Sequence, residues 1–191
     1  MSEKLEPFLL NFDRETGLLK PYKTQNLARL SDLKEFYYDK EIVQEMLSRG
    51  DDPLIYEAYW FTQRPSAEFF NVGSTIIHPG KVGDEYFHTK GHFHVKEMTS
   101  EVYITLKGRG IFMMQTREGR VKYLDLEPNT AVYVYPWWAH RVVNTGKEKL
   151  VTLFICPADA GADHCRGSQA FRKLVVEKDE KPKIIGNPIF G

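Results

Sequence analysis

The residues of this sequence best suited to chemistry are His92, His94, Glu101 and His140, in the pattern H-x-H-x6-E-x38-H. Alternate side chains of a β-strand share a face, so a strand through residues 92–95 would direct His92 and His94 to one side. Three imidazoles and one carboxylate can surround a divalent transition metal and leave coordination positions open. Structural zinc sites usually complete their coordination with cysteines, so this set predicts one catalytic metal site per chain.

The segments around these four residues strengthen the prediction, because an isolated H-x-H pair is common by chance. Residues 101–107 alternate polar and apolar side chains before Gly108, and His140 follows the strand-like run 131–135 and Pro136. These patterns place the ligands on hairpin strands. Mixed histidine–carboxylate sites accept Fe²⁺, Mn²⁺, Ni²⁺, Co²⁺ or Zn²⁺, so the sequence alone leaves the metal open.

Short strands account for nearly all of the chain after residue 53. Turn signals such as Glu118-Gly119 and Thr145-Gly146 separate many of the apolar or alternating runs. The predicted strands are 54–62, 67–78, 85–89, 92–95, 101–107, 110–116, 120–126, 131–135, 140–144, 148–156 and 172–178. Many short strands at this spacing predict an all-β sandwich or barrel. A small barrel suits a metal pocket because alternate residues face its interior.

The first 53 residues differ from the rest of the chain. Ser31 is predicted to cap a helical turn over 32–36, and Asp39 to cap a second helix that ends at Gly50. The apolar face of the second helix comprises Ile42, Val43, Met46 and Leu47. We expect residues 1–191 to form a single domain, in which 1–53 is a mixed extension with short helices that packs on the barrel.

Composition argues against several classes of protein. Lys plus Arg and Asp plus Glu each total 26, so the zero net charge gives no electrostatic case for binding nucleic acid or an anionic membrane. No apolar run approaches the roughly 20 residues of a membrane helix. The first residues lack a signal-peptide pattern, so we expect a cytoplasmic protein. Its two cysteines, Cys156 and Cys165, are then expected to be free, inert thiols.

The sequence resembles a known family at several specific motifs. Gly91-His92-Phe93-His94, Glu101 and Gly108 resemble the first motif of the cupins, and Pro136, His140 and Asn144 resemble the second. A closer resemblance, to the metal-dependent, cupin-type glucose-6-phosphate isomerases, is carried by the segments 56–59, 79–83, 89–94, 101–103 and 157–161. It extends from about Phe8 to Pro188, nearly the whole chain.

The resemblance implies a fold, an activity and an assembly. The fold would be a cupin, a double-stranded β-helix or small jelly-roll barrel. The activity would be the interconversion of glucose 6-phosphate and fructose 6-phosphate in glycolysis and gluconeogenesis, with Fe²⁺ the first expectation among the metals and a homodimer as the assembly. Alternatives are a metal cupin acting on another substrate, such as an iron dioxygenase, and a non-enzymatic sugar-binding cupin.

The implied reaction assigns roles to particular residues. Glu101 and His140 are the predicted catalytic residues, with Glu101 as the natural base because it is the only carboxylate among the four. The reaction can follow two routes: a base moves a proton from C2 to C1 through an enediol, or hydride shifts directly between the two carbons. The base route has a difficulty, because a carboxylate bound to metal has little lone-pair density left to accept a proton. Tyr103 shares a strand face with Glu101, so it is either a pocket residue or a core aromatic; the resemblance favours the pocket.

A sugar phosphate also requires an anion site. The predicted phosphate-binding residues are Thr75, Thr89, Lys90 and Gly91, which offer two hydroxyls, one point charge and a backbone amide. The sequence departs from the family pattern nearby, with Cys156, Ala162 and His164 where tyrosine, histidine and tyrosine are expected. His88, four residues before His92, could also face the pocket, whereas His78 is predicted to be a turn residue.

Overall fold

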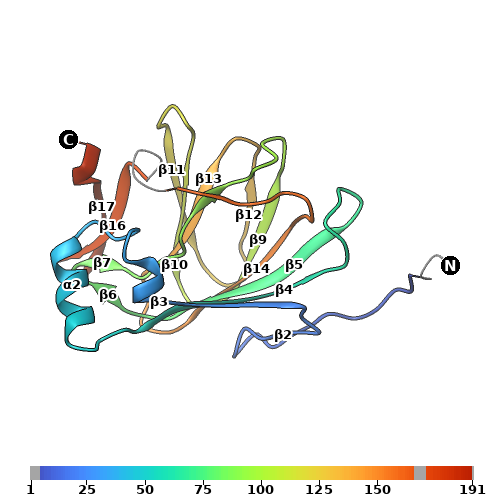
Figure 1. The fold of residues 1–191 in the computed structure, drawn as a ribbon, viewed down its shortest axis with the longest axis horizontal. Coiled ribbons are helices and arrows are strands. Elements are labelled where there is room, and N and C mark those ends of the chain that lie inside the picture. Colours follow the sequence, from blue (N-terminus) through green and yellow to red (C-terminus); the bar gives the residue numbers. More distant parts are fainter. Residues whose placement is uncertain (1–4, 166–170, 191) are drawn as a thin grey trace.

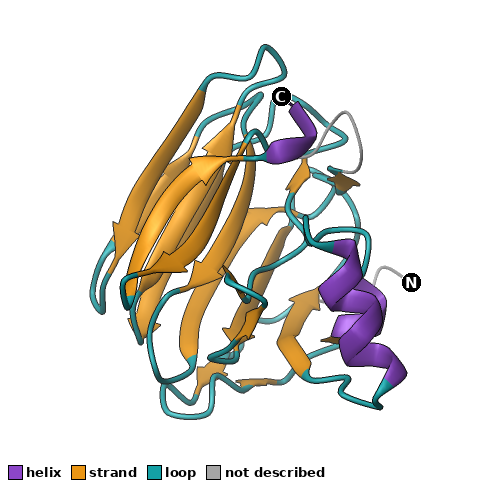
Figure 2. Ribbon diagram, turned by 90° about the vertical axis from the view of Figure 1, so that its left-hand side faces the viewer, coloured by secondary structure: helices purple, strands orange, loops and turns teal. Residues whose placement is uncertain are grey.

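The computed structural model describes residues 5–165 and 171–190, and the fold is built almost entirely from antiparallel strands (Figures 1 and 2). One sheet has the order β12 (Ala131–Val134), β9 (Glu101–Lys107), β14 (Leu150–Pro157), β5 (Phe70–Ile77), β4 (Leu54–Thr62) and β3 (Thr24–Arg29). A second sheet has the order β11 (Val121–Leu126), β10 (Gly110–Gln115), β13 (Ala139–Asn144), β8 (His92–Phe93) and β15 (Asp163–His164).

The order of these strands identifies the fold. Within the first sheet β12, β9, β14 and β5 are neighbours, and within the second β11, β10, β13 and β8 are neighbours. These are the two four-stranded halves of a jelly roll, in which the chain passes back and forth between facing sheets. The predicted all-β fold of cupin type is therefore confirmed.

Apolar side chains from both sheets fill the space between them. Tyr103 on β9 packs in one core cluster with Phe112 and Met114 on β10 and Val142 on β13. Along β9 the buried positions alternate, with Glu101, Tyr103 and Thr105 facing inward. Alternate residues of a strand share a face, so the same periodicity that buries the core directs Glu101 into the barrel.

Smaller elements close one end of the barrel. A third sheet joins β17 (Lys181–Gly186), β16 (Lys173–Lys178), β7 (Glu85–Tyr86) and β6 (Lys81–Val82). Helix α1 (Leu30–Leu33) precedes α2 (Lys40–Ser48), and α2 lies beside β6 and β7 (Figure 1). The strands β1 (Asn11–Phe12) and β2 (Leu19–Lys20) form a separate pair, and a 3₁₀ turn, η2, spans Pro188–Phe190.

The second predicted helix agrees with the structure. Asp39 caps α2 by accepting a hydrogen bond from the Ile42 amide at 3.0 Å, and Gly50 follows the helix with φ of +78°. Val43 is buried, and the other residues of the predicted apolar face pack against the core. A left-handed conformation just beyond the last turn favours glycine, which explains why the helix ends there.

The first predicted helix was placed wrongly. Helix α1 occupies Leu30–Leu33 rather than 32–36, and its N-cap is Arg29 rather than Ser31. The reason is a distant partner: the amide and hydroxyl of Ser31 both donate to the carboxylate of Asp52, each at 2.8 Å. The Arg29 amide donates to Asp32 instead, at 2.9 Å, so that the helix starts earlier.

Strand predictions were accurate where the pattern was long and regular. The bounds of β4 and β9 agree with the predicted 54–62 and 101–107, whereas the predicted 67–78 is shortened to Phe70–Ile77 and 85–89 to Glu85–Tyr86. Strand β3 was missed, and it pairs with β4 at the edge of the first sheet. The division into one domain with a 1–53 extension stays a prediction. Among the described residues, none of the helices is long and apolar enough to span a membrane.

Candidate active site

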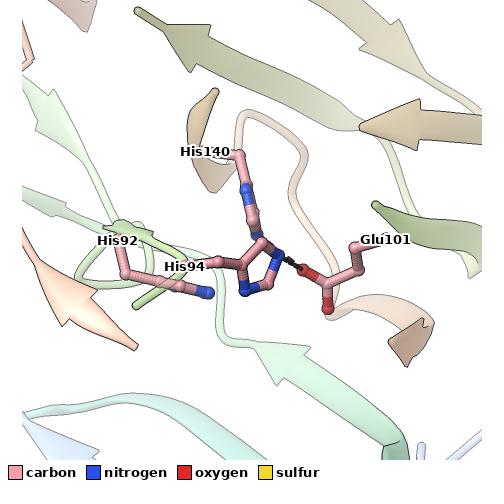
Figure 3. Close-up of side chains that lie close together, drawn as sticks. All are labelled: His92, His94, Glu101 and His140. Carbon is pink, nitrogen blue, oxygen red and sulfur yellow. Dashed lines mark ion pairs between the residues drawn. The ribbon is translucent and has the colours of Figure 1, made fainter. Parts of the chain in front are cut away.

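Four side chains converge inside the barrel, three from strands of the two sheets and one, His94, from just after β8 (Figure 3). His92 on β8 and His140 on β13 are direct partners in the second sheet, and Glu101 begins β9 in the first. One ligand atom from each of His92, His94, Glu101 and His140 lies within 4.8 Å of the others. The two sheets therefore bring together the set of residues that the sequence pattern singled out.

The contacts within this cluster fit a bound cation. Oε2 of Glu101 lies 2.8 Å from Nε2 of His140 and 3.3 Å from Nε2 of His94. Among the described residues, none supplies a well-aligned hydrogen bond to any of these three buried atoms. Buried polar atoms are normally satisfied, so polar atoms that face one another without hydrogen bonds are suited to share a metal.

The outer nitrogens of two rings fix their orientation. Nδ1 of His94 lies 3.3 Å from the Gly161 carbonyl oxygen, and Nδ1 of His140 lies 3.4 Å from that of Trp138. A carbonyl oxygen only accepts, so each Nδ1 must carry the hydrogen and each Nε2 is left with a lone pair directed inward. This tautomer is the one that a metal-binding imidazole requires.

The electrostatics of the cluster also suit ligation. Burial opposes ionisation of Glu101, but the close approach of His140, with help from His94, outweighs it and holds the pKa of Glu101 well below its usual range. Partial burial of His92 in the cavity wall, followed by the effect of His140, lowers its pKa well below 6.5. A carboxylate and a neutral imidazole are the protonation states that bind metal.

The cluster lies in the wall of a cavity of about 310 Å³. The residues predicted to bind substrate, Thr75, Thr89, Lys90, Gly91 and Tyr103, all line the same cavity. The structure thus brings the predicted residues together, while their individual roles stay predictions. Sequence reasoning missed part of the wall, which includes Asn26, Tyr56, Trp60, Asn71 and Phe154. These come from β3, β4, β5 and β14, and only the pairing of the strands brings them to one place.

Three of the phosphate-binding candidates, Thr89, Lys90 and Gly91, form one segment of the cavity wall, and the fourth, Thr75, lies on β5 of the first sheet. The segment at Thr89 is fixed to β13, because the Thr89 amide donates to the Val142 carbonyl at 3.0 Å and the Val142 amide donates to Oγ1 of Thr89 at 3.1 Å. Gly91 has φ of +75°, and a Cβ there would lie 2.6 Å from the ring of Phe171, so only glycine fits. Of the described residues that line the cavity, Lys90 is the only lysine or arginine.

The three departures from the family pattern also face this cavity. Cys156, Ala162 and His164 are all in its wall. Nδ1 of His164 lies 3.3 Å from the Gly91 carbonyl oxygen, and the ring centroids of His164 and His92 are 6.0 Å apart. His164 therefore supplies a polar group near the phosphate-binding candidates. Burial, followed by the charge of Glu101, raises the pKa of Cys156 to about 12, which makes it a neutral thiol.

The remaining histidines have other surroundings. His88 is buried and contacts Glu85 at 3.2 Å, in a cluster separate from the cavity wall. His78 follows β5 and lies 2.9 Å from Glu57. Cys165 is buried and free, with a pKa that burial raises to about 11, as expected for an inert thiol.

Comparison with known proteins points to the same family as the sequence motifs. A family model described as Glucose-6-phosphate isomerase (GPI) matches residues 27–179. The glucose-6-phosphate isomerase of Pyrococcus horikoshii is 44% identical over 184 residues, covering 96% of each chain. That of Sinorhizobium medicae is 36% identical, covering 86% of this chain and 77% of its own.

The match to one solved structure, an oxalate decarboxylase, is weaker in sequence. A deletion mutant of Bacillus subtilis oxalate decarboxylase is 18% identical, with a TM-score of 0.47 over 60% of this chain and 28% of that chain. The fold assignment therefore depends on the strand order, and the family assignment on the sequence matches, which cover nearly the full length of this chain. The chain belongs to the cupin-type glucose-6-phosphate isomerase family.

Proposed function

We propose that this chain interconverts glucose 6-phosphate and fructose 6-phosphate, with one divalent transition metal held by His92, His94, Glu101 and His140. The observation that carries the proposal is the convergence of their four ligand atoms within 4.8 Å in the wall of a cavity that also contains Lys90. The reaction needs a place for the carbonyl end of the sugar and a place for its phosphate, and this cavity offers candidate residues for both.

The reaction moves one hydrogen between adjacent carbons of the open-chain sugar. Going from the aldose to the ketose, the C2–H and O2–H bonds break, and C1–H and O1–H bonds form. The metal, when bound, supplies Lewis acidity that polarises the two oxygens. The carboxylate of Glu101, which is ionised because its surroundings hold its pKa low, can accept the C2 proton and return it to C1.

Other residues would hold the substrate in register with Glu101. Burial, followed by the charge of Glu101, raises the pKa of Tyr103 well above 10, so its hydroxyl keeps its hydrogen and can donate to a sugar oxygen. Lys90 supplies a positive charge for the phosphate, and Thr75, Thr89 and the Gly91 amide supply hydrogen-bond donors. Phosphate held at this side of the cavity would orient the sugar chain toward the metal ligands.

The proposed assembly and location follow the family expectation. Leu5, Phe8 and Leu9 near the N-terminus expose 48%, 56% and 80% of their surface, and a homodimer that covers such side chains would remove them from water. The proposed metal is Fe²⁺ and the proposed location is the cytoplasm. Sedimentation velocity would test the dimer, and metal analysis of protein purified without added metal would test iron.

The decisive experiment is an isomerase assay with defined metal. Protein stripped with a chelator is reconstituted with Fe²⁺ without oxygen, or with Mn²⁺, Ni²⁺, Co²⁺ or Zn²⁺, and given fructose 6-phosphate while glucose 6-phosphate is detected by a coupled enzyme. We expect turnover that is abolished by stripping and restored by at least one metal. Oxygen consumption without isomerisation would instead support a dioxygenase. Substrate binding without turnover with every metal would support a sugar-binding cupin.

A further inference from the structure

A second cluster of charged side chains is buried directly behind the proposed phosphate site. Its members are Glu85 on β7, His88 between β7 and β8, and Arg141 on β13, and each is at most 4% exposed. We call these three residues the Glu85 network. Oε1 of Glu85 lies 3.2 Å from Nε2 of His88 and 3.9 Å from Nη2 of Arg141, while Nη1 of Arg141 lies 3.5 Å from Nε2 of His88. The other carboxylate oxygen, Oε2, accepts from the Tyr38 amide at 3.1 Å.

The protonation state of His88 follows from these contacts. Burial, followed by the charge of Arg141, lowers the pKa of His88 and keeps the ring neutral, although Glu85 acts in the opposite direction. Nδ1 of His88 lies 2.8 Å from the Thr89 carbonyl oxygen and must donate to it, so Nε2 is an acceptor for Arg141. Glu85 and Arg141 are therefore the two opposite charges of the network.

Stability alone does not explain why these charges are buried. Within the described part of the chain, Oε1 of Glu85, Nε of Arg141 and the hydroxyl of the adjacent Tyr37 lack a well-aligned hydrogen-bond partner. Buried ion pairs with incomplete hydrogen bonding can often be replaced by apolar side chains at no loss of stability. The network is therefore expected to serve a purpose other than holding the core together.

Two members of the network, Arg141 and His88, are tied directly to segments that line the cavity. Arg141 directly follows the proposed metal ligand His140, and its Nη2 donates to the Lys173 carbonyl on β16 at 3.2 Å. His88 holds the Thr89 carbonyl, and Thr89 is bonded through both its amide and its hydroxyl to Val142. The strand that carries His140 is thereby fixed to the segment that leads to His92.

The backbone at Gly91 is enclosed by the same residues. The Arg141 guanidinium lies 4.7 Å above the ring of Phe171, and a Cβ at Gly91 would lie 3.1 Å from Cβ of Arg141 and 2.6 Å from that ring. Arg141 and Phe171 thus form the surface on which Gly91 rests. A displacement of Arg141 would move the main chain between Thr89 and His92, where the phosphate-binding candidates meet the first ligand.

We infer that Glu85 and Arg141 are positioning residues, which hold the segment from His88 to His92 against the start of β13 so that the phosphate site and two metal ligands keep their relative places. The inference rests on the proposed function. The charges act on the segment through His88 and Thr89, and none of the three network side chains lines the cavity. Loss of either charge should therefore alter metal and phosphate binding together.

The test uses the variants Glu85→Gln, Arg141→Met and the double variant that combines them. Each single change leaves one buried charge without its partner, which should lower stability, whereas the double change removes both charges and should restore stability. The separating measurement is the affinity of chelator-stripped protein for Co²⁺, followed by visible absorption, together with KM for fructose 6-phosphate at saturating Co²⁺. We expect the double variant to unfold like the wild type but to bind Co²⁺ about tenfold more weakly.

Kinetic constants provide a second readout. Saturating Co²⁺ should restore most of kcat in the double variant, whereas KM for fructose 6-phosphate should stay raised, because excess metal refills the ligand site but does not reposition Thr89, Lys90 and Gly91. The control is Leu19→Ala, since Leu19 is fully buried in a different cluster, with Tyr59, Ile76 and Val151. It should lose stability and keep both Co²⁺ affinity and KM.

The outcomes separate this inference from the proposed function. A double variant with wild-type stability, Co²⁺ affinity and KM would overturn the positioning role, and so would a double variant that fails to fold, because the network would then be needed for folding itself. A wild-type protein that binds no Co²⁺ and none of the other metals would refute the metal site, and with it the proposed function.

Discussion

Oε2 of Glu101 and Nε2 of His140 lie 2.8 Å apart, although the two residues belong to opposite sheets of the barrel. Both side chains are almost fully buried, and neither atom has a well-aligned hydrogen bond from any described residue. Two sheets that face each other across a core can bring such groups together only if inward-facing positions on both are polar at the same depth. This contact is therefore a consequence of the jelly-roll fold and the centre of the proposed metal site.

The first prediction concerns metal content. The double change His92→Ala and His140→Ala removes two of the four proposed ligands, and these two lie on neighbouring strands, so bound metal should fall from about one per chain to nearly none. Inductively coupled plasma mass spectrometry of the desalted protein measures this directly. The control is His78→Ala, because His78 contacts Glu57 rather than the cluster and should leave the content unchanged. Unchanged metal in the double variant would place the site elsewhere.

The second prediction concerns the phosphate. Lys90→Ala removes the only lysine or arginine that lines the cavity among the described residues, so KM for fructose 6-phosphate should rise roughly tenfold to a hundredfold. Binding of unphosphorylated fructose should change little. Lys96→Ala is the matched control, since Lys96 lies outside the cavity wall and pairs with Asp159 at 2.7 Å. Equal effects on both sugars would remove Lys90 from the phosphate site.

Part of the fold and site was accessible from the sequence because its signals are local. The alternation in residues 101–107 directs Glu101 inward, and the H-x-H pattern singles out His92 and His94, although β8 ends at Phe93 and His94 lies just beyond it. The four proposed ligands could therefore be picked out from local patterns. The Asp39 cap and Gly50 stop of α2 are likewise short-range effects. Ser31 was misassigned because its partner, Asp52, lies far along the chain, and no local pattern announces that contact.

Other parts depend on contacts that a sequence does not display. Strand β3 lacks an alternating apolar pattern and forms because β4 offers an edge for pairing. Strand β17 contains Pro182, which lowers strand propensity, and it is stabilised by pairing with β16. Asn26 and Phe154 face the cavity from distant strands, and the Glu85 network joins residues from β7 and β13. In each case the position is set by tertiary pairing rather than by local propensity.

The third prediction concerns stability and pH in the absence of metal. Burial, then His140, lowers the pKa of His92 well below 6.5, whereas the unfolded chain has the ordinary value. As pH falls below about 6.5 the unfolded state binds more protons than the folded state, so the free energy of unfolding decreases, by up to about 1.4 kcal/mol per pH unit for this group. Glu101, whose pKa is depressed, adds a further loss at lower pH.

Urea unfolding of chelator-stripped protein from about pH 7 to about pH 5 measures this dependence. The variant His92→Asn should show a shallower decrease, because asparagine does not titrate. Some dependence should persist, since burial also lowers the pKa of His88. Identical slopes for the variant and the wild type would show that His92 titrates normally in the folded protein.

The fourth prediction concerns Tyr103. The change Tyr103→Phe keeps the ring, whose centroid lies 4.8 Å from that of Phe112, and removes only the hydroxyl. Folding should be nearly unaffected, but kcat/KM should fall about tenfold, which corresponds to one lost hydrogen bond to a polar substrate group of about 1.5 kcal/mol. Thermal unfolding and steady-state kinetics at saturating metal are the measurements. A loss of stability with unchanged kcat/KM would assign Tyr103 to the core alone.

The last prediction concerns Glu101. Glu101→Gln preserves size and one oxygen ligand but cannot accept a proton, so if Glu101 is the base kcat should fall by about 10²–10⁴. The comparison requires matched metal occupancy, verified by metal analysis of each sample, because a weaker ligand lowers kcat through lost metal. The matched control is Glu97→Gln, at an exposed carboxylate paired with Arg117. Gln115→Glu would not be a suitable control, because Gln115 accepts a hydrogen bond from the Arg172 amide.

This experiment separates two routes, proton transfer through Glu101 and a direct hydride shift. A general base is most effective with a pKa near the working pH, whereas a metal ligand is best kept ionised, so the two roles make different demands on Glu101, whose pKa is held low. Fully metallated Glu101→Gln protein with near-normal kcat would exclude the base role and favour a direct hydride shift. Turnover in deuterated water adds an independent measure: deuterium in the product at the carbon that receives hydrogen requires an enediol, whereas its complete absence indicates hydride transfer or a base shielded from solvent.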